Sequence, residues 1–395
     1  MKDGTRLSEE EVGPWHGTGL RRPGRGETLF ATDRLRGRLC WLGPIGLVRS
    51  GGWFPALGLS TPPVVDRLAV RVVVDNAQDA LQRSARVGNV EVERVGMIME
   101  PDLGRQVVSQ FGLGYHLESR RGDETRSMLL DFGPTAQSEL ENLDLFKIDT
   151  ASVDALIMSH GHFDHFGGLM PLLERDRAKM RRDLPLYVGG EDTFCYRWFE
   201  RPNGERKSAG VVSRSALGSA HVRLVMADQA AVIGGQAFTT GAIPRNSFEQ
   251  VLPSTKVEIG LRDGAGCEAS HFTSEERAGK IVFDRFPGEH ATCFNVKDRG
   301  LVILSSCSHC GIINTIRQAQ AVSGQQKVHA VMGGFHLTVA PEEYVARTVA
   351  ALKDLDPDYV IPMHCSGATF TWMVRDAMPG KLIMSYTGTR FVFGG

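Results

Sequence analysis

The sequence lacks an excess of charge of either sign. Lys and Arg together number 45 and Asp and Glu number 46, which leaves a formal net charge of -1 in a chain of 395 residues. No basic stripe is visible, and proteins that bind nucleic acids contact the phosphates through such stripes. The balance of charge therefore argues against a nucleic-acid partner.

Long apolar runs are also absent. A membrane-spanning helix needs about 20 apolar residues, and the nearest candidate, residues 39–59, contains Arg49, several glycines and two prolines. We therefore predict no membrane association. Arg21 and Arg22 weakly resemble a twin-arginine export signal, but further arginines interrupt the segment that follows. A cytoplasmic protein is the main expectation, and a periplasmic protein with a degenerate export signal is the alternative.

Cysteines are few and irregularly spaced. Seven occur, at positions 40, 195, 267, 293, 307, 310 and 365. An odd number without a regular framework is typical of reduced thiols in an intracellular protein rather than of a disulfide scaffold. Cys307 and Cys310 form a C-x-x-C motif, but the histidine between them favours a metal site over a redox motif.

The composition changes near Pro62 and Pro63. Residues 1–60 are rich in Gly, Arg and Pro and show little periodicity, so we expect a poorly ordered or peripheral N-terminal arm. Residues 61–395 should form one domain, which begins with a β-branched strand at 68–74. Less regular segments at about 190–215 and 262–280 should be inserts that wall the functional site, with exposed loops at 203–210 and 262–279.

Five apolar runs in the rest of the chain predict buried strands. They lie at 128–132, 155–159, 301–306, 330–334 and 359–363. Helical patterns at 312–322 and 341–355 separate the last three runs, and this alternation is the signature of parallel βαβ units. We therefore predict an α/β fold whose central strands are buried on both faces.

The strongest chemical signal is the run His160-Gly161-His162-Phe163-Asp164-His165. His160 and His162, two apart on an extended segment, can hold one metal ion, and Asp164 and His165 can hold a second. Imidazole nitrogens and one carboxylate suit zinc, and also iron or manganese. Without a metal, three imidazoles would repel one another when protonated and would lack partners when buried. The run therefore predicts a site for one or two ions.

Four of the five predicted strands lead into a histidine, namely His160, His309, His336 and His364. Because the carboxyl ends of parallel strands lie at one edge of a sheet, we expect these four side chains to converge. Asp131 ends a neighbouring strand, and we expect it to accept hydrogen bonds from the metal loop rather than to bind metal itself.

The run from His160 to His165 resembles the H-x-H-x-D-H signature of the metallo-β-lactamase superfamily, and Gly167-Gly168-Leu169 follows it as that signature requires. Segments 240–245, 306–311, 333–337 and 364–367 are similar to the dihydropterin-synthase-like branch, to which a chlorothalonil hydrolytic dehalogenase would also be related. The resemblance covers about residues 65–395. It implies a metallo-β-lactamase-fold catalytic domain, a four-layer αβ/βα sandwich of two mixed sheets with metals at one edge.

The resemblance also implies a role for each donor. His160 and His162 would hold the first ion, and Asp164, His165 and His364 the second. Asp164 would in addition orient the attacking hydroxide. These roles make the centre a dinuclear one, most simply with zinc.

Three further residues are open to more than one role. His309 stands where many relatives have a bridging Asp, and His336 would be either a ligand or a catalytic acid that faces the substrate. The branch usually has an acidic pair where this chain has Glu289 and His290, so His290 is a candidate for the third ligand of the first ion.

The function implied by the resemblance is metal-dependent hydrolysis of a small organic substrate by a zinc-activated hydroxide. The bond can be an ester, a lactone, a phosphoester or an activated aryl halide. Arg245 and Glu289 are candidate substrate contacts, with solvated surface charge as the alternative. The main competing hypothesis is a pterin-type synthase or transferase that binds a diphosphate through its metal, and a further one is a redox or non-catalytic metal protein. A homo-oligomer is compatible with the sequence.

Overall fold

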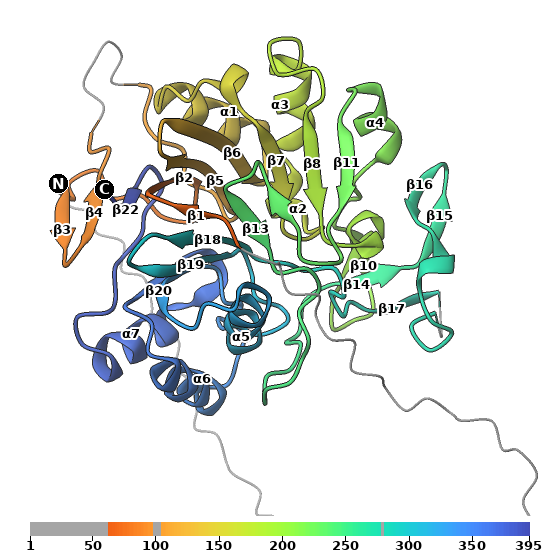
Figure 1. The fold of residues 1–395 in the computed structure, drawn as a ribbon. Helices are drawn as coiled ribbons and strands as arrows, with labels where there is room; N and C mark the ends of the chain where they lie inside the picture. Colours follow the sequence, from red (N-terminus) through yellow and green to blue (C-terminus); the bar gives the residue numbers. More distant parts are fainter. Residues whose placement is uncertain (1–61, 98–103, 278–279) are drawn as a thin grey trace, which may run out of the picture. The chain divides into compact units, whose positions relative to one another are not determined.

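The computed structural model describes residues 62–97, 104–277 and 280–395 (Figure 1). The expected N-terminal arm at 1–60 lies outside the described residues, so that prediction stays untested. Among the residues described, no helix combines the length and the apolar character that a membrane span requires. The described residues form two large mixed sheets and two small antiparallel ones.

One large sheet has nine strands. In spatial order they are β11 (Arg223–Met226), β8 (Pro185–Val188), β7 (Ala155–Met158), β6 (Glu124–Phe132), β5 (Gly114–Arg121), β2 (Arg67–Val74), β22 (Arg390–Gly394), β4 (Val90–Glu93) and β3 (Ala85–Val87). The neighbours from β11 to β6 run parallel, and the pairs from β6 to β3 are antiparallel. The strand predicted at 68–74 is β2.

The other large sheet has seven strands. Its order is β12 (Val232–Ile233), β13 (Ala237–Thr239), β18 (Thr292–Val296), β19 (Gly300–Ser305), β20 (Val328–Gly333) and β21 (Tyr359–Pro362), and β1 (Val64–Val65) pairs with β18. The last three strands are parallel and the pairs from β12 to β19 are antiparallel. The sequence β19–α5–β20–α6–β21 is the predicted pair of βαβ units.

Helices cover the outer face of each large sheet (Figure 1). The α-helices are α1 (Ala136–Leu145), α2 (Phe163–Phe166), α3 (Leu169–Asp176), α4 (Arg214–Ser219), α5 (Ile312–Ser323), α6 (Glu342–Leu355) and α7 (Ala368–Ala377). Short 3-10 helices lie at Thr150–Ser152, Glu191–Phe194, Ala269–His271 and His364–Ser366. The predicted helices at 312–322 and 341–355 are α5 and α6, and Pro341 precedes α6 as its N-cap.

Alternation of side chains along each strand builds the layers. On β6, Met128 and Leu130 point into a core shared by the two sheets, whereas Leu129 faces the core beneath α1 and α3. On β19, Val302 packs in the shared core, whereas Ile303 faces α5, α6 and α7. Because both faces are buried, these strands need continuous apolar runs. The predicted four-layer αβ/βα sandwich of two mixed sheets is confirmed.

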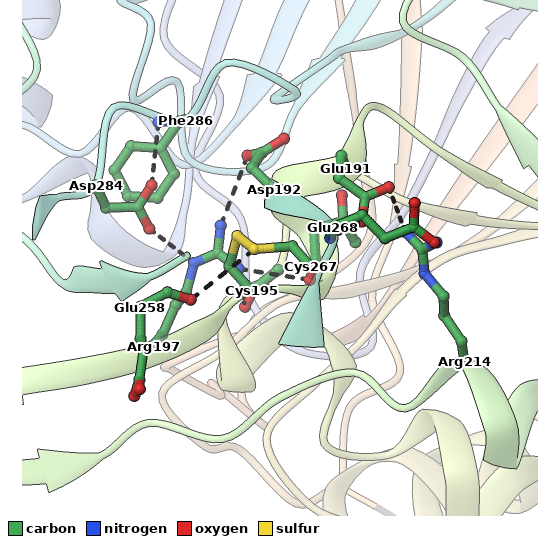
Figure 2. The surroundings of a disulfide bond; sticks show 12 residues. Glu191, Asp192, Cys195, Arg197, Arg214, Glu258, Cys267, Glu268, Asp284 and Phe286 are labelled. Atoms are coloured by element: carbon green, nitrogen blue, oxygen red, sulfur yellow. Dashed lines mark hydrogen bonds and ion pairs between the residues drawn. A yellow bond between two sulfur atoms is a disulfide. The ribbon is translucent and has the colours of Figure 1, made fainter. Parts of the chain in front are cut away.

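The predicted inserts contain strands rather than only loops. One small sheet joins β10 (Arg206–Ser208), β9 (Tyr196–Glu200), β14 (Lys256–Glu258) and β17 (Ile281–Phe283), and a hairpin joins β15 (Gly260–Arg262) to β16 (Ala265–Cys267). The prediction of an exposed loop at 262–279 is wrong for Cys267, which is buried and forms a disulfide with Cys195 (Figure 2). The prediction of reduced thiols therefore fails for this pair, because the fold brings together two cysteines that lie 72 residues apart.

Candidate metal centre

The candidate site lies where the carboxyl ends of strands from both large sheets meet. Strands β6 and β7 deliver Asp131 and His160, and β19 and β21 deliver Cys307 and His364. Four of the residues at this edge that are not glycine, Asp131, Ser308, His336 and His364, have φ between 45° and 57°. Left-handed backbone costs of order 1–3 kcal/mol at such residues and tends to cluster at functional sites.

The first group of donors consists of His160, His162 and His309. One ring nitrogen of each lies within 4.8 Å of the others, and all three side chains are buried. His162 is extended, with φ -83° and ψ 145°, and the helix α2 begins directly after it. The backbone thus keeps His160 and His162 on one side, as their spacing predicts, and then turns Asp164 and His165 towards a second group.

The second group consists of Asp164, His165 and His364, whose donor atoms also lie within 4.8 Å of one another. Nε2 of His364 is 3.3 Å from Oδ2 of Asp164, and its Nδ1 is 3.2 Å from Oδ1 of Asn76. The amide oxygen can only accept, so Nδ1 of His364 carries a proton and its Nε2 is directed at the carboxylate of Asp164. A cation placed between them could bind both groups.

Asp131 fixes the outward nitrogens of two imidazoles. Its carboxylate accepts the backbone N–H and the hydroxyl of Ser159, each at 2.8 Å, and Nδ1–H of His165 at 2.9 Å. Because the Ser159 hydroxyl donates to Asp131, its oxygen must accept from Nδ1 of His160, 2.9 Å away. The inward Nε2 of His160 is left with its lone pair, and that of His165 faces Sγ of Cys307, as in metal sites whose ligands are oriented by outer partners.

Several of these inward atoms have no hydrogen-bond partner. Nε2 of His160 and both ring nitrogens of His309 are buried and unpartnered among the described residues. An unpaired buried polar group costs about 1–3 kcal/mol. Bound metal ions would take up the lone pairs of these atoms, so the residues present fit the metal ions that the sequence predicts.

The pKa shifts of the donor side chains are also consistent with metal binding. Burial, together with the neighbouring imidazoles, holds the pKa of His160 and of His309 well below the usual value. Burial opposes charge on His165 as well, but the carboxylates of Asp164 and Asp131 outweigh it and raise the pKa of that imidazole to about 9. Burial disfavours the charged form of Asp164, yet His165 and His364 lower the pKa of that carboxyl overall. A divalent cation would take the place of the proton on His165.

Two cysteines that the sequence analysis did not propose as ligands lie in the centre. Sγ of Cys307 is 3.2 Å from Nε2 of His165 and groups with His160, and Sγ of Cys365 is 3.4 Å from that of Cys307 and groups with His364. Both cysteines follow a predicted strand, as the histidines do, and this signal could have identified them. Thiolates favour zinc and other soft metals over magnesium or calcium.

His309, which stands where many relatives have a bridging Asp, does not lie between the two donor groups. Cys307 belongs both to the donor group of His160 and His165 and to that of His364 and Cys365, whereas His309 groups only with His160 and His162. The left-handed Ser308, with φ 57°, turns the chain between them. Cys307 therefore holds the intermediate position, and His309 supplies the third imidazole of the first group.

His290 and His336 lie outside the donor groups found in the described residues. Nε2 of His290 is 3.0 Å from the carbonyl oxygen of Met158, its Nδ1 is buried without a hydrogen-bond partner among the described residues, and neither nitrogen joins a donor group. Nε2 of His336 is 3.2 Å from the carbonyl oxygen of Pro253, so the predicted ligand role is not supported for His336. The ring centroids of His336 and His309 are 4.3 Å apart, and both residues line a hollow beside the centre.

The two predicted substrate contacts differ. Glu289 is 2% exposed, and its carboxylate accepts the backbone N–H groups of His309 at 2.9 Å and Cys310 at 2.7 Å. It supports the His309 loop, and a contact between Glu289 and a substrate stays a prediction. Arg245 is exposed, and its guanidinium reaches the carbonyl oxygen of Arg285 and lies 3.6 Å from Sγ of Cys310. It stays a candidate contact.

Comparison with known proteins gives three relevant similarities. The family model of the metallo-beta-lactamase superfamily matches residues 120–202. A 7,8-dihydropterin-6-methyl-4-(beta-D-ribofuranosyl)-aminobenzene-5'-phosphate synthase of Methanocaldococcus jannaschii is 30% identical over 265 residues, which cover 66% of this chain and 82% of that protein. An uncharacterised protein of the same organism is 24% identical over 245 residues, 61% of this chain and 80% of its own length.

Among solved structures, Tm1679, described as a metal-dependent hydrolase of the beta-lactamase superfamily, matches with a TM-score of 0.58 and 20% identity. The match covers 82% of this chain and 98% of Tm1679, and it supports the fold. Membership of the superfamily supports an enzyme that binds metal ions. On the signature at 160–165, the fold and the 30% identical relative, this chain belongs to the metallo-beta-lactamase superfamily, in the branch of the dihydropterin-type synthase.

Proposed function

We propose that this chain is a metal-dependent hydrolase whose centre holds two zinc ions, with iron or manganese as alternatives. One observation carries the proposal: buried donors converge from both large sheets, and the inward ring nitrogens of His160 and His309 have no hydrogen-bond partner among the described residues. The first ion would be held by His160, His162 and His309. The second would be held by Asp164, His165 and His364, with the thiol of Cys307 between the two groups. The thiol favours zinc.

When bound, such ions polarise a substrate oxygen and supply a nucleophilic hydroxide at neutral pH. Asp164 lies against both His165 and His364, so its carboxylate can accept a hydrogen bond from the attacking nucleophile and orient it. Burial disfavours the charged form of His336, but Cys365 outweighs burial and raises the pKa of this imidazole. In its protonated form, His336 could donate a proton to the leaving group.

The substrate would be a small organic molecule that enters through the hollow lined by His309 and His336. Ester, lactone, phosphoester and activated aryl halide substrates all place an electrophilic atom where a hydroxide can attack it. Arg245, exposed beside Cys310, would contact a polar or anionic part of the substrate.

The test is hydrolysis by metal-free and metal-loaded protein of a panel with one substrate of each of the four classes. We expect zinc-dependent turnover of at least one class. Asp164→Asn should abolish this turnover, and His336→Gln should lower kcat by about 100-fold or more while leaving metal content unchanged, as expected for a general acid that is not a ligand. Absence of turnover across the panel with both ions bound would refute the proposal.

A second candidate function has one specific observation in its favour, the 30% identity to a synthase. A pterin-type synthase or transferase would bind a diphosphate through its metals and form a bond to an aromatic acceptor without net hydrolysis of the rest of the substrate. Tight, metal-dependent binding of a pterin diphosphate by protein that hydrolyses nothing on the panel would favour this second function.

A further inference from the structure

Asp284 is a buried residue whose carboxylate accepts hydrogen bonds from Thr255 and Phe286, each of which contacts an imidazole of the first donor group. It follows β17 of the small four-stranded sheet and is 1% exposed. Its Oδ2 accepts Nε–H of Arg197 at 2.7 Å and the hydroxyl of Thr255 at 3.1 Å, and its Oδ1 accepts the backbone N–H of Phe286 at 3.1 Å. Figure 2 shows Asp284 between Arg197 and Phe286. Neither oxygen belongs to a donor group of the centre.

The first of these contacts leads to His162. Oγ1 of Thr255 is 2.9 Å from Nε2 of His162. A carboxylate can only accept, so the single hydroxyl proton of Thr255 goes to Asp284 and its oxygen must accept from Nε2–H of His162. These two hydrogen bonds therefore fix the tautomer of His162, with its proton on Nε2, and leave the lone pair of Nδ1 for the first metal ion.

The second contact leads to His309. Phe286 stacks on the imidazole of His309, with ring centroids 3.8 Å apart and an interplanar angle of 5°. Neither ring nitrogen of His309 has a hydrogen-bond partner, so ring contacts hold the plane of this imidazole. Phe286 has φ 47°, a strained conformation for an aromatic residue, and the hydrogen bond from its N–H to Asp284 helps to hold it there.

Arg197 connects Asp284 and Phe286 to the loop at 160–165. Its side chain is fully buried, donates from Nη1 to the carbonyl oxygen of Gly161 at 3.1 Å, and lies with Cζ 5.9 Å from the centroid of the Phe286 ring. Gly161 separates His160 from His162, and a Cβ there would lie 2.3 Å from Nη1 of Arg197. The guanidinium therefore takes the space that a side chain at position 161 would need.

We propose that Asp284, held by Arg197, is the positioning residue for the first metal ion. It orients two of the three imidazoles of the first group, His162 through Thr255 and His309 through Phe286. It touches neither His165 nor His364. The inserted sheet that carries Arg197 and Asp284 thus completes one half of the centre. This inference rests on the proposed metal-binding function.

The test separates the two ions. We would prepare the Asp284→Asn variant, load it with zinc, and determine both dissociation constants by competition with a chelating dye. Outer partners of ligands change metal affinity by about 10–100-fold, so we expect one ion to bind at least 10-fold more weakly and the other to bind as in the wild-type protein. Asp192→Asn is the matched control, because Asp192 is also buried and lies 3.6 Å from Arg197.

Thr255 provides a variant that leaves the Arg197–Asp284 ion pair intact. Thr255→Val should weaken the same ion, and Thr255→Ser, which keeps the hydroxyl, should restore its affinity. With cobalt in place of zinc, Thr255→Val should alter the absorption bands of one ion, whereas a merely structural effect would leave the bands of folded protein unchanged. The inference would be overturned if the zinc dissociation constants and the cobalt absorption bands of the Asp284 and Thr255 variants equalled those of the wild-type protein. Wild-type protein that binds no metal would instead refute the proposed function.

Discussion

Replacement of Asp131 by asparagine should weaken the whole metal centre. The Asp131 carboxylate accepts three hydrogen bonds, two from Ser159 and one from His165. An asparagine of the same shape has one accepting oxygen, so at least one of these bonds is lost. Since Ser159 in turn orients His160, the change reaches one ligand of each ion, unlike the change at Asp284.

The expected magnitude follows from the contacts. A hydrogen bond to a charged group contributes about 1.5–3 kcal/mol, which corresponds to roughly 10–100-fold in affinity. The same range is typical when an outer partner of a metal ligand is removed. We therefore expect both zinc dissociation constants of Asp131→Asn to rise by about 10–100-fold.

The assay is competition with a chelating dye on metal-free protein, with unfolding measured in parallel to show that the variant is folded. Glu139→Gln is the control, because Glu139 is buried near Asp131 but its carboxyl oxygens have no hydrogen-bond partner. Folded Asp131→Asn protein with both dissociation constants unchanged would show that Asp131 does not orient the ligands.

Three further predictions concern stability and thiols. Burial and the Asp131 carboxylate raise the pKa of Glu139 from 4.5 to about 8, so its contribution to stability is complete below pH 4.5 and is lost as the pH rises through 8. Denaturation between pH 4.5 and 8 should show a smaller loss of unfolding free energy in Glu139→Gln than in the wild-type protein, by on the order of 4 kcal/mol. An equal pH dependence of the unfolding free energy in the two proteins would contradict this. Alkylation in denaturant should leave Cys195 and Cys267 unlabelled until a reductant is added, and labelling of both beforehand would exclude the disulfide. Cys307→Ser should weaken zinc binding more than manganese binding, and equal effects in dye competition would exclude a thiolate ligand.

Much of the fold and half of the centre could be predicted from the sequence. Strands such as β6 and β19 are buried on both faces, so their apolar runs stand out, and parallel pairing brings their ends together. The signature at 160–165 is local in sequence, and it predicted donors that do lie together.

The rest depends on contacts between residues that are far apart. Cys307 and His309 are two positions apart, and only the left-handed turn at Ser308 decides which of them lies between the two groups. Glu289 was predicted as a substrate contact because its charge is visible in the sequence, whereas its burial and its hydrogen bonds to the His309 loop are not. Asp284 lies in an irregular segment, and its importance follows only from the packing of the inserted sheet.

Metal stoichiometry is the most direct test of the central claim that two groups of donors form a dinuclear centre. Elemental analysis should be made on protein saturated with zinc and then freed of loosely bound metal. We predict two zinc ions per chain, and one per chain in a His364→Ala variant, which keeps the first donor group intact. About one ion per wild-type chain or fewer, or the same content in the variant, would contradict the account.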